Sequence, residues 1–151
     1  MSTGGESCPL MGRFDHALDP KRRLTIPSVW RRAMGNPDFV YAMLDRKERC
    51  VNILPKAEME VLQERLREKA LFDPALNRVW QVVGSMGEQL DLDVQGRIRI
   101  SDRLLQYANL TTTVAMVGSF RMIKLWNPSV LGPADEIDAS KLDAALAAAG
   151  L

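Results

Sequence analysis

Two short segments of the sequence repeat the same arrangement of charged residues. DPKRRLTIP at 19–27 and DVQGRIRIS at 93–101 each place an aspartate four residues before an arginine, at the start of a short β-prone run. An Asp and an Arg at this spacing can form an ion pair across a tight turn, and an exposed pair contributes only about 0.2–1 kcal/mol to stability. Two interpretations of Asp19 and Asp93 therefore stay open, a purely structural role in the turn or a role in binding as well.

The first segment carries three successive cations, Lys21, Arg22 and Arg23, in a stretch from 13 to 35 where six basic residues face only two acidic ones. Adjacent positive charges repel one another, and phosphate groups would relieve that repulsion. We therefore predict that these three residues bind DNA, with Arg13 on the neighbouring strand as a further contact. Lysine and backbone amides would hold phosphates, while an arginine could bond to O6 and N7 of guanine in the major groove.

The second segment is less basic, because its arginines stand beside two aspartates. We predict that Arg97 and Arg99 serve mainly the fold or a subunit contact, with DNA contact as the lesser alternative. Arg31 and Arg32, in the short helix that follows the first segment, could touch phosphates, but a solvated helix face is the preferred interpretation.

The composition argues against several other functions. Of the 151 residues, 46% are hydrophobic and 26% are charged, and the formal net charge is +1. No apolar run approaches the roughly 18 residues of a membrane span, and the N-terminus lacks the pattern of a secretory signal, so we expect a cytoplasmic protein without a membrane partner. One histidine, two cysteines without C-x-x-C spacing and no phosphate-binding glycine loop predict no metal site, no cofactor, no small-molecule substrate and no enzyme activity.

The elements that position the first segment follow from periodicity and turn residues. Alternation predicts a β-hairpin over 14–26 with its turn at Asp-Pro, and Ser28 and Gly35 are expected to begin and end a short helix. Two β-prone runs, 39–44 and 50–54, predict a second hairpin. An apolar stripe over 56–71 predicts an amphipathic helix that packs on the core or on a partner helix, and Asp-Pro at 73–74 predicts the start of another helix that ends near Gly84.

From residue 86 onward the same order of elements returns, at an offset of seventy-four residues that falls to seventy-two. The sequence therefore indicates a tandem duplication. One unit can hardly bury enough apolar area to offset its chain entropy, so we expect the two units to pair about a pseudo-twofold axis. Closure would remove exposed strand edges, which predicts one closed β-barrel with added helices in a β-rich α+β fold.

We divide the chain accordingly. The expected parts are a flexible leader (1–10), a first repeat (11–56), a helical connector (57–84), a second repeat (85–129) and a C-terminal tail (130–151). The three tryptophans, Trp30, Trp80 and Trp126, fall at apolar positions and are expected in the core.

The sequence resembles the MraZ family in GRFDHALDPKRRLTIPSVWRRAMG, a strand pair ending in NILP, a long helix, DPALNRVW, LDLDVQGRIRIS and VGSFRMIKLW. The family pattern is two copies of Asp-x-x-x-Arg, each on a SpoVT-AbrB (swapped-hairpin) unit, and the resemblance covers about 12–127. It implies a bacterial DNA-binding transcriptional regulator of the division and cell-wall gene cluster, associated with the nucleoid. It also implies a homo-oligomeric ring that binds repeated promoter boxes in double-stranded DNA, and we expect a repressor.

The chain departs from this pattern at three positions in the two segments. Arg22 stands where the family usually has glycine, so we expect the turn to lose easy access to a left-handed conformation while it gains a charge. Gln95 stands where lysine is common, and Ser101 where proline is usual.

A second function stays open beside DNA binding. Small duplicated barrels also serve as protein-interaction or antitoxin-like modules without direct DNA readout, and the helix predicted over 56–71 offers a docking face.

Overall fold

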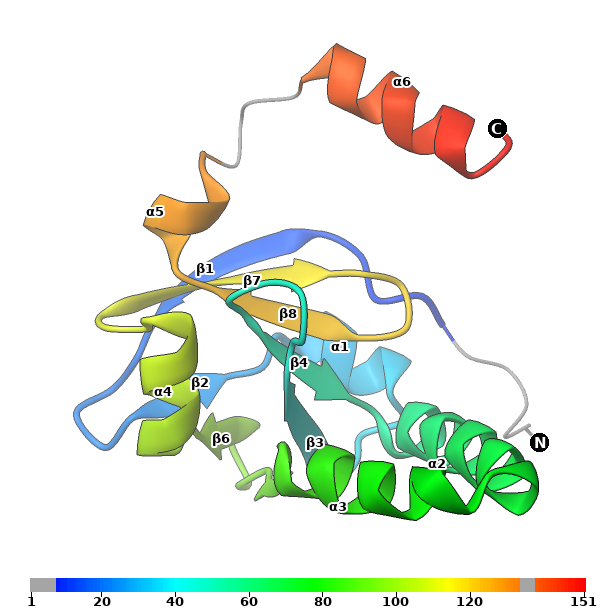
Figure 1. Cartoon of the computed structure of the whole chain (residues 1–151). Helices are drawn as coiled ribbons and strands as arrows, with labels where there is room; N and C mark the ends of the chain where they lie inside the picture. The colour runs from blue at the N-terminus through cyan, green and yellow to red at the C-terminus, as the bar shows by residue number, and fades with distance from the viewer. Residues whose placement is uncertain (1–7, 134–137) are drawn as a thin grey trace.

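The computed structural model describes residues 8–133 and 138–151. Among these residues the fold is α+β and rich in antiparallel β-structure, as predicted (Figure 1). The first half contains β1 (Arg13–Ala17), β2 (Arg23–Thr25), α1 (Ser28–Ala33), β3 (Phe39–Leu44) and β4 (Val51–Leu54). A helical segment follows, with α2 (Lys56–Phe72), the short 3-10 helix η1 (Pro74–Leu76) and α3 (Asn77–Ser85). The second half contains β5 (Gly87–Asp91), β6 (Arg97–Arg99), α4 (Asp102–Ala108), β7 (Thr113–Gly118) and β8 (Ile123–Trp126), and α5 (Pro128–Leu131) and α6 (Ala139–Ala148) complete the chain.

The strands form two sheets. Six of them are ordered β1-β7-β8-β4-β3-β5, and β2 pairs only with β6 as a separate two-stranded antiparallel ribbon. The described residues therefore form no closed ring of hydrogen-bonded strands, which corrects the prediction of a single closed barrel. The reason is that β2 and β6 are only three residues long and bond to each other, so they do not bridge the sheet edges at β1 and β5.

The two predicted hairpins differ in outcome. The second is confirmed, because β3 pairs with β4. In the first, β1 and β2 do not pair with each other: β1 pairs with β7, and β2 pairs with β6. Each of these two strands thus pairs with a strand from the other half of the chain. Neither half forms these strand pairs by itself.

When each strand of 13–54 is exchanged for its counterpart in 87–126, the order of the six-stranded sheet is the same read in reverse. Counterpart residues also face each other directly, Leu24 opposite Ile98 in the ribbon and Asn52 opposite Lys124 between β4 and β8. The two halves therefore contribute equivalent strands to the sheets.

The core lies between the ribbon, the short helices and the six-stranded sheet. Its fully buried side chains include Leu24, Ile26, Trp30, Ile53, Ile98, Ile100, Leu104, Met116, Ile123 and Leu125. Trp30 and Trp126 are buried as predicted. Trp80 is not in the core: it is half-buried on α3, where it lines a groove together with apolar residues of α2.

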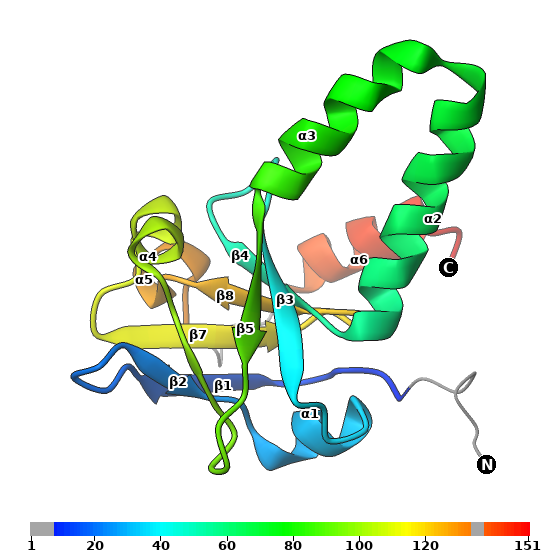
Figure 2. The same ribbon diagram turned by 90° about the horizontal axis from the view of Figure 1, so that it is seen from below.

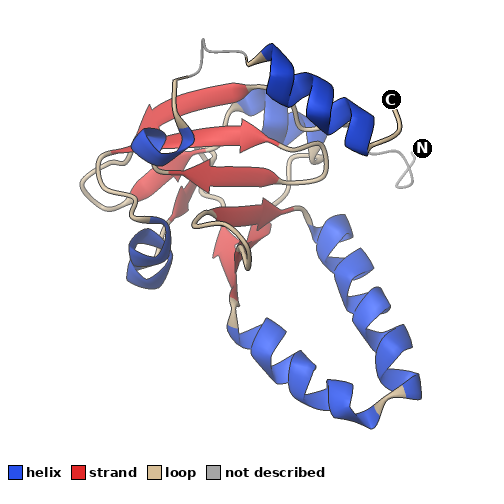
Figure 3. Cartoon of the chain, turned by 45° about the horizontal axis from the view of Figure 1, so that its top comes forward, coloured by secondary structure: helices blue, strands red, loops and turns tan. Residues whose placement is uncertain are grey.

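The helices α2, η1 and α3, which we call the arm, project from the sheets as a helical hairpin (Figures 2 and 3). No residue of the arm is fully buried. The predicted stripe on α2 is half-buried at Met59, Leu62 and Leu66, but Leu71 and Phe72 near the tip are 74% and 89% exposed. The arm thus leaves apolar side chains partly or largely exposed along its length.

The predicted helix ends are partly right. Asp73 caps η1 by accepting a bond from the Ala75 amide, and Gly35, with φ of +84°, follows the end of α1. The prediction that Ser28 caps α1 is wrong, because Ser28 is already helical and the preceding residue, Pro27, has no side chain that could accept a hydrogen bond.

The described parts of the two chain ends differ in burial. Residues 1–7 of the predicted leader lie outside the described residues, but Leu10 is buried and pairs with Phe120. In the tail, the described residues 138–151 are exposed throughout. Within the described residues, no helix has both the length and the apolar character needed to cross a bilayer.

Candidate nucleic-acid interface

The first turn, residues 19–23, is built around the carboxylate of Asp19. This carboxylate accepts hydrogen bonds from the backbone amides of Lys21 and Arg23, at 2.9 and 2.7 Å, and from Nε of Arg23 at 2.6 Å. The Arg22 amide donates to the Asp19 carbonyl at 2.8 Å and closes the turn. The bond from the Arg23 amide, together with the guanidinium, lowers the pKa of Asp19 below its usual value, so the side chain is charged at neutral pH.

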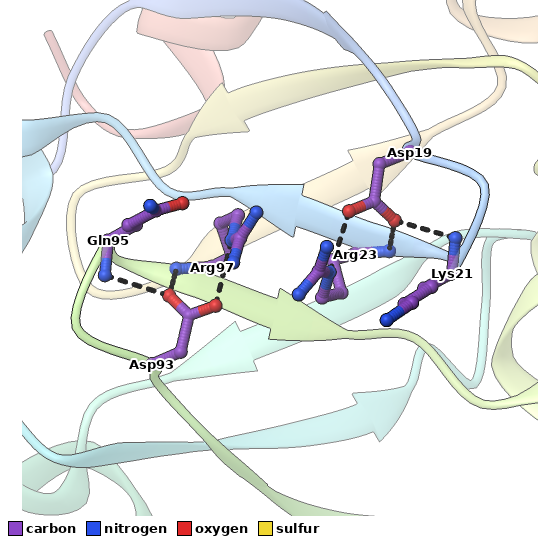
Figure 4. Close-up of polar contacts among 6 residues, drawn as sticks. All are labelled: Asp19, Lys21, Arg23, Asp93, Gln95 and Arg97. Carbon is purple, nitrogen blue, oxygen red and sulfur yellow. Dashed lines mark hydrogen bonds and ion pairs between the residues drawn. The ribbon is translucent and has the colours of Figure 1, made fainter.

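The second turn, residues 93–97, repeats this geometry bond for bond (Figure 4). Asp93 accepts from the amides of Gln95 and Arg97, both at 2.9 Å, and from Nε of Arg97 at 2.7 Å. The Gly96 amide donates to the Asp93 carbonyl at 2.9 Å. The same kinds of bond, that from the Arg97 amide first, lower the pKa of Asp93. Both carboxylates are thus engaged within their own turns.

The corner of each turn has a left-handed backbone. It is occupied by Arg22, with φ of 62°, in the first turn and by Gly96, with φ of +77°, in the second. The carbonyl of each corner residue accepts a 2.9 Å bond from across the ribbon, Arg22 from Ile100 and Gly96 from Ile26. The expectation that Arg22 would keep the turn out of the left-handed region is therefore wrong, because these bonds hold it there at a cost of the order of 1–2 kcal/mol.

Between the two turns, the ribbon directs three arginines to one face, where Arg99 is exposed and Arg23 and Arg97 are half-buried. The register places Arg23 opposite Arg99 and Thr25 opposite Arg97, with the buried pair Leu24 and Ile98 between them. Because side chains alternate along a strand, burial of that pair directs its neighbours outward. We call the outward residues Arg23, Thr25, Arg97 and Arg99 the ribbon face.

The ribbon face was only half predicted from the sequence. Treated as separate segments, the two motifs suggested a basic first turn and a structural second one. The alternation of arginine and isoleucine in RIRI at 97–100 was the available signal that Arg97 and Arg99 share an outer face. The missing information was the pairing of β2 with β6, which brings the arginines of both motifs together.

Of the predicted contacts, Lys21 and Arg22 are exposed and lie beside Arg23, and the guanidinium of Arg22 pairs with Asp102 at the start of α4. Arg13 is not brought to this cluster. It lies at the opposite end of β1 from the turn, where it binds Asp15 at 2.9 Å and the Gly132 carbonyl at 2.7 Å. The bond with Asp15 raises the pKa of Arg13.

The two arginines of α1 differ in position. Arg32 is exposed, whereas Arg31 is half-buried and lies against Gly96 of the second turn. Arg31 therefore belongs spatially to the second turn, although in the sequence it follows the first.

A second polar cluster, centred on the Asn52–Lys124 pair of β4 and β8, joins the two halves. Nζ of Lys124 donates to Asp45 at 2.8 Å and to Asn52 at 3.1 Å, and the hydroxyl of Tyr107 donates to the Asp45 carbonyl. Burial of Asp45 opposes its ionisation, but the bonds from Lys124 and Asn52 outweigh it and hold the pKa of Asp45 far below its usual value. Beside this cluster, burial raises the pKa of the Cys50 thiol to about 12, so that this thiol is not a nucleophile.

In the part of the chain that the structure describes, no group of three or more His, Cys, Asp and Glu side chains is placed to hold a metal ion.

Comparison with known proteins identifies the family of the chain. The profile of the family described as "MraZ protein, putative antitoxin-like" matches residues 86–130. The chain is 32% identical over 116 residues to the "Transcriptional regulator MraZ" of Symbiobacterium thermophilum, covering 77% of this chain and 82% of that one. It is 31% identical over 112 residues to the protein of the same name from Mannheimia succiniciproducens, covering 73% and 74%, and 29% identical over 117 residues to that of Clostridium acetobutylicum, covering 78% and 80%. The chain therefore belongs to the MraZ family.

Proposed function

We propose that this protein is a DNA-binding transcriptional regulator and that the ribbon face, with the first turn at its end, contacts double-stranded DNA. The observation that carries the proposal is the set of three outward arginines on a two-stranded ribbon whose opposite face is buried in the core. The major groove of B-DNA is wide enough to admit such a ribbon. The names of the curated relatives, all transcriptional regulators, support the same function.

The turn geometry suggests how the contacts divide. Asp19 holds the Arg23 guanidinium by its Nε, which leaves the two terminal nitrogens as donors in a fixed orientation. A guanidinium positioned in this way suits O6 and N7 of guanine, and one good bidentate contact discriminates between bases by about 1–3 kcal/mol. Lys21 and Arg22, exposed on the same turn, are placed for phosphates.

The ribbon also supports a duplicated architecture. The bonds of the first turn recur in the second at an offset of seventy-four residues, and β2 and β6 meet with counterpart residues opposite each other. We interpret the chain as two SpoVT-AbrB units related by a pseudo-twofold axis through the ribbon. A protein with such an axis matches the approximate twofold symmetry of duplex DNA.

For the target and the assembly we follow the family resemblance. We propose that the protein represses the bacterial division and cell-wall gene cluster, in association with the nucleoid, as a ring of identical subunits on repeated promoter boxes. One ribbon is too small to select a promoter, whereas a ring makes later contacts intramolecular and so raises avidity. Exposed Leu71 and Phe72 at the tip of the arm support contacts between subunits.

The alternative is a protein-interaction module of the antitoxin-like type. It is favoured by an apolar groove at the base of the arm, lined by Tyr41, Met43, Met59, Leu62, Leu66, Trp80 and Val83. A groove of this composition accepts an apolar helix or loop of a partner rather than DNA.

The two functions can be separated by measuring the affinity for the promoter of its own gene cluster at several salt concentrations. We expect the logarithm of the binding constant of the wild-type protein to fall steeply with the logarithm of salt, by about 0.9 per phosphate contact. The double variant Lys21→Ala with Arg23→Ala should abolish binding without loss of the fold. A matched control removes two charges from α2, Arg65→Ala with Arg67→Ala, and should bind like wild type. Full binding by a folded Lys21/Arg23 variant would favour the interaction module.

A further inference from the structure

At the corner of the second turn, the side chain of Arg31 lies close to Gly96. It fills the space that a side chain on residue 96 would need. A Cβ built on Gly96 would lie 2.5 Å from both Cζ and Nε of Arg31. Gly96 is correspondingly buried, whereas Arg22, its counterpart in the first turn, is exposed. The guanidinium of Arg31 thus covers the glycine and takes the place of a side chain on that corner.

The position of Arg31 is fixed by the backbone of its own half. Its Nε donates to the Ile26 carbonyl at 3.0 Å, and the Ile26 amide donates to the Gly96 carbonyl at 2.9 Å. This chain of bonds ties the helix α1 to the second turn. It holds the guanidinium in one orientation while leaving its terminal nitrogens out of the contact with Ile26.

The first turn has a guanidinium at its corner for a different reason. Its corner residue, Arg22, carries its own guanidinium, and the counterpart of Arg31 in α4 is the uncharged Leu105, which packs partly against the core. Each corner therefore has one guanidinium, which comes from the turn itself in the first case and from the helix of the other half in the second.

We propose that Arg31 is a DNA contact of the second turn and supplies to a backbone phosphate the positive charge that Gln95 and Gly96 do not carry. This inference rests on the proposed function. Its consequence is that the two turns, at opposite ends of the ribbon, both contact the duplex, so that the second turn is a binding element rather than only a structural one. A guanidinium already held by Ile26 loses little rotamer freedom on binding, which favours such a contact.

The test compares Arg31→Ala with Arg32→Ala, which removes the same charge from the exposed neighbour on the same helix. Affinity for the promoter duplex is measured at several salt concentrations, with thermal unfolding as a check on the fold. We expect Arg31→Ala to bind about five- to tenfold more weakly and to lower the salt slope by about 0.9, and Arg32→Ala to stay within about twofold of wild type. Equal affinities of the two variants would overturn the inference.

Two further variants keep the result unambiguous. Gly96→Ala retains every charge but displaces the Arg31 guanidinium, so we expect it to weaken binding about as much as Arg31→Ala; wild-type affinity in Gly96→Ala would count against the contact. Arg23→Ala, measured alongside, separates the two claims. If Arg23→Ala loses binding while Arg31→Ala does not, only the present inference fails. If neither variant weakens binding, the proposed function fails as well.

Discussion

The two turns share one backbone frame but differ in where their charge comes from. In both, an aspartate carboxylate binds two amides and one Nε, with bond lengths that agree within 0.2 Å between the turns. The first turn adds Lys21 and Arg22 of its own, whereas the second has Gln95 and Gly96 and is covered by Arg31. The Asp-x-x-x-Arg spacing thus specifies the frame of the turn, while the cation at its corner can come from either half of the chain.

The largest expected effect comes from the core beneath the ribbon, where it tests whether the two halves contribute equally to stability. Leu24 and Ile98 face each other and are fully buried, so Leu24→Ala and Ile98→Ala should each lower the free energy of unfolding by about 2–5 kcal/mol. Urea unfolding followed by circular dichroism measures both. If one substitution were nearly neutral, the two halves would not share the core equally.

A smaller effect is expected where the equivalence of the halves is broken. The cluster of Asp45, Asn52, Lys124 and Tyr107 joins unlike residues across the β4–β8 pair. Asp45→Asn removes the charged acceptor of Lys124, which should lower the free energy of unfolding by about 1.5–3 kcal/mol at pH 7. Asn52→Ala, which leaves the ion pair in place, is the milder control; a larger loss in that variant would contradict the assigned role of Asp45.

The same carboxylate predicts a pH dependence with a definite sign. The pKa of Asp45 is lowered in the folded protein, so its stabilisation is complete above its unfolded value of about 4 and is lost as the pH falls toward the folded value. Thermal unfolding between about pH 7 and pH 2 should show a decline below about pH 4 that is shallower in Asp45→Asn. An equal decline in both proteins would assign acid sensitivity to other groups, such as Asp19 and Asp93, whose pKa values are also lowered.

The smallest effect on stability concerns the corner of the first turn. Arg22→Gly relieves the left-handed strain but also removes the exposed ion pair with Asp102, so we expect stability to change by no more than about 1 kcal/mol while DNA affinity falls about five- to tenfold. Adding Leu105→Arg to that variant copies the second turn and should restore most of the affinity. If the double variant folds but binds DNA no better than Arg22→Gly alone, a cation supplied by the helix of the other half cannot replace the one in the turn.

Much of the fold could be predicted from the sequence, because local signals are strong. The strand at 39–44, the cap at Asp73 and the repeated order of elements follow from alternation, turn chemistry and spacing. The pairing of β1 with β7 could not be predicted, since it joins segments about a hundred residues apart. Nothing in the local sequence of either segment indicates the other as its partner. The closed barrel failed for the same reason, because closure depends on long-range pairing of the edge strands.

The candidate site divides in the same way. The cluster of Lys21, Arg22 and Arg23 is contiguous and was visible, and so was the Asp-x-x-x-Arg spacing. A simple hairpin would place Arg13 beside this cluster, but the structure separates them along β1. The position of Arg31 over Gly96 could not be foreseen, because it depends on how α1 of one half packs against the turn of the other.

The most direct test of the central claim removes equal charge from two surfaces and compares the effect on DNA binding. One triple variant changes the ribbon face, Arg23→Ala with Arg97→Ala and Arg99→Ala; the other changes α2, Arg65→Ala with Arg67→Ala and Lys69→Ala. At one salt concentration, we predict that the ribbon variant binds the promoter duplex at least about a hundredfold more weakly than wild type and that the α2 variant stays within about threefold. Equal losses, or a greater loss in the α2 variant, would contradict the assignment of DNA binding to the ribbon face.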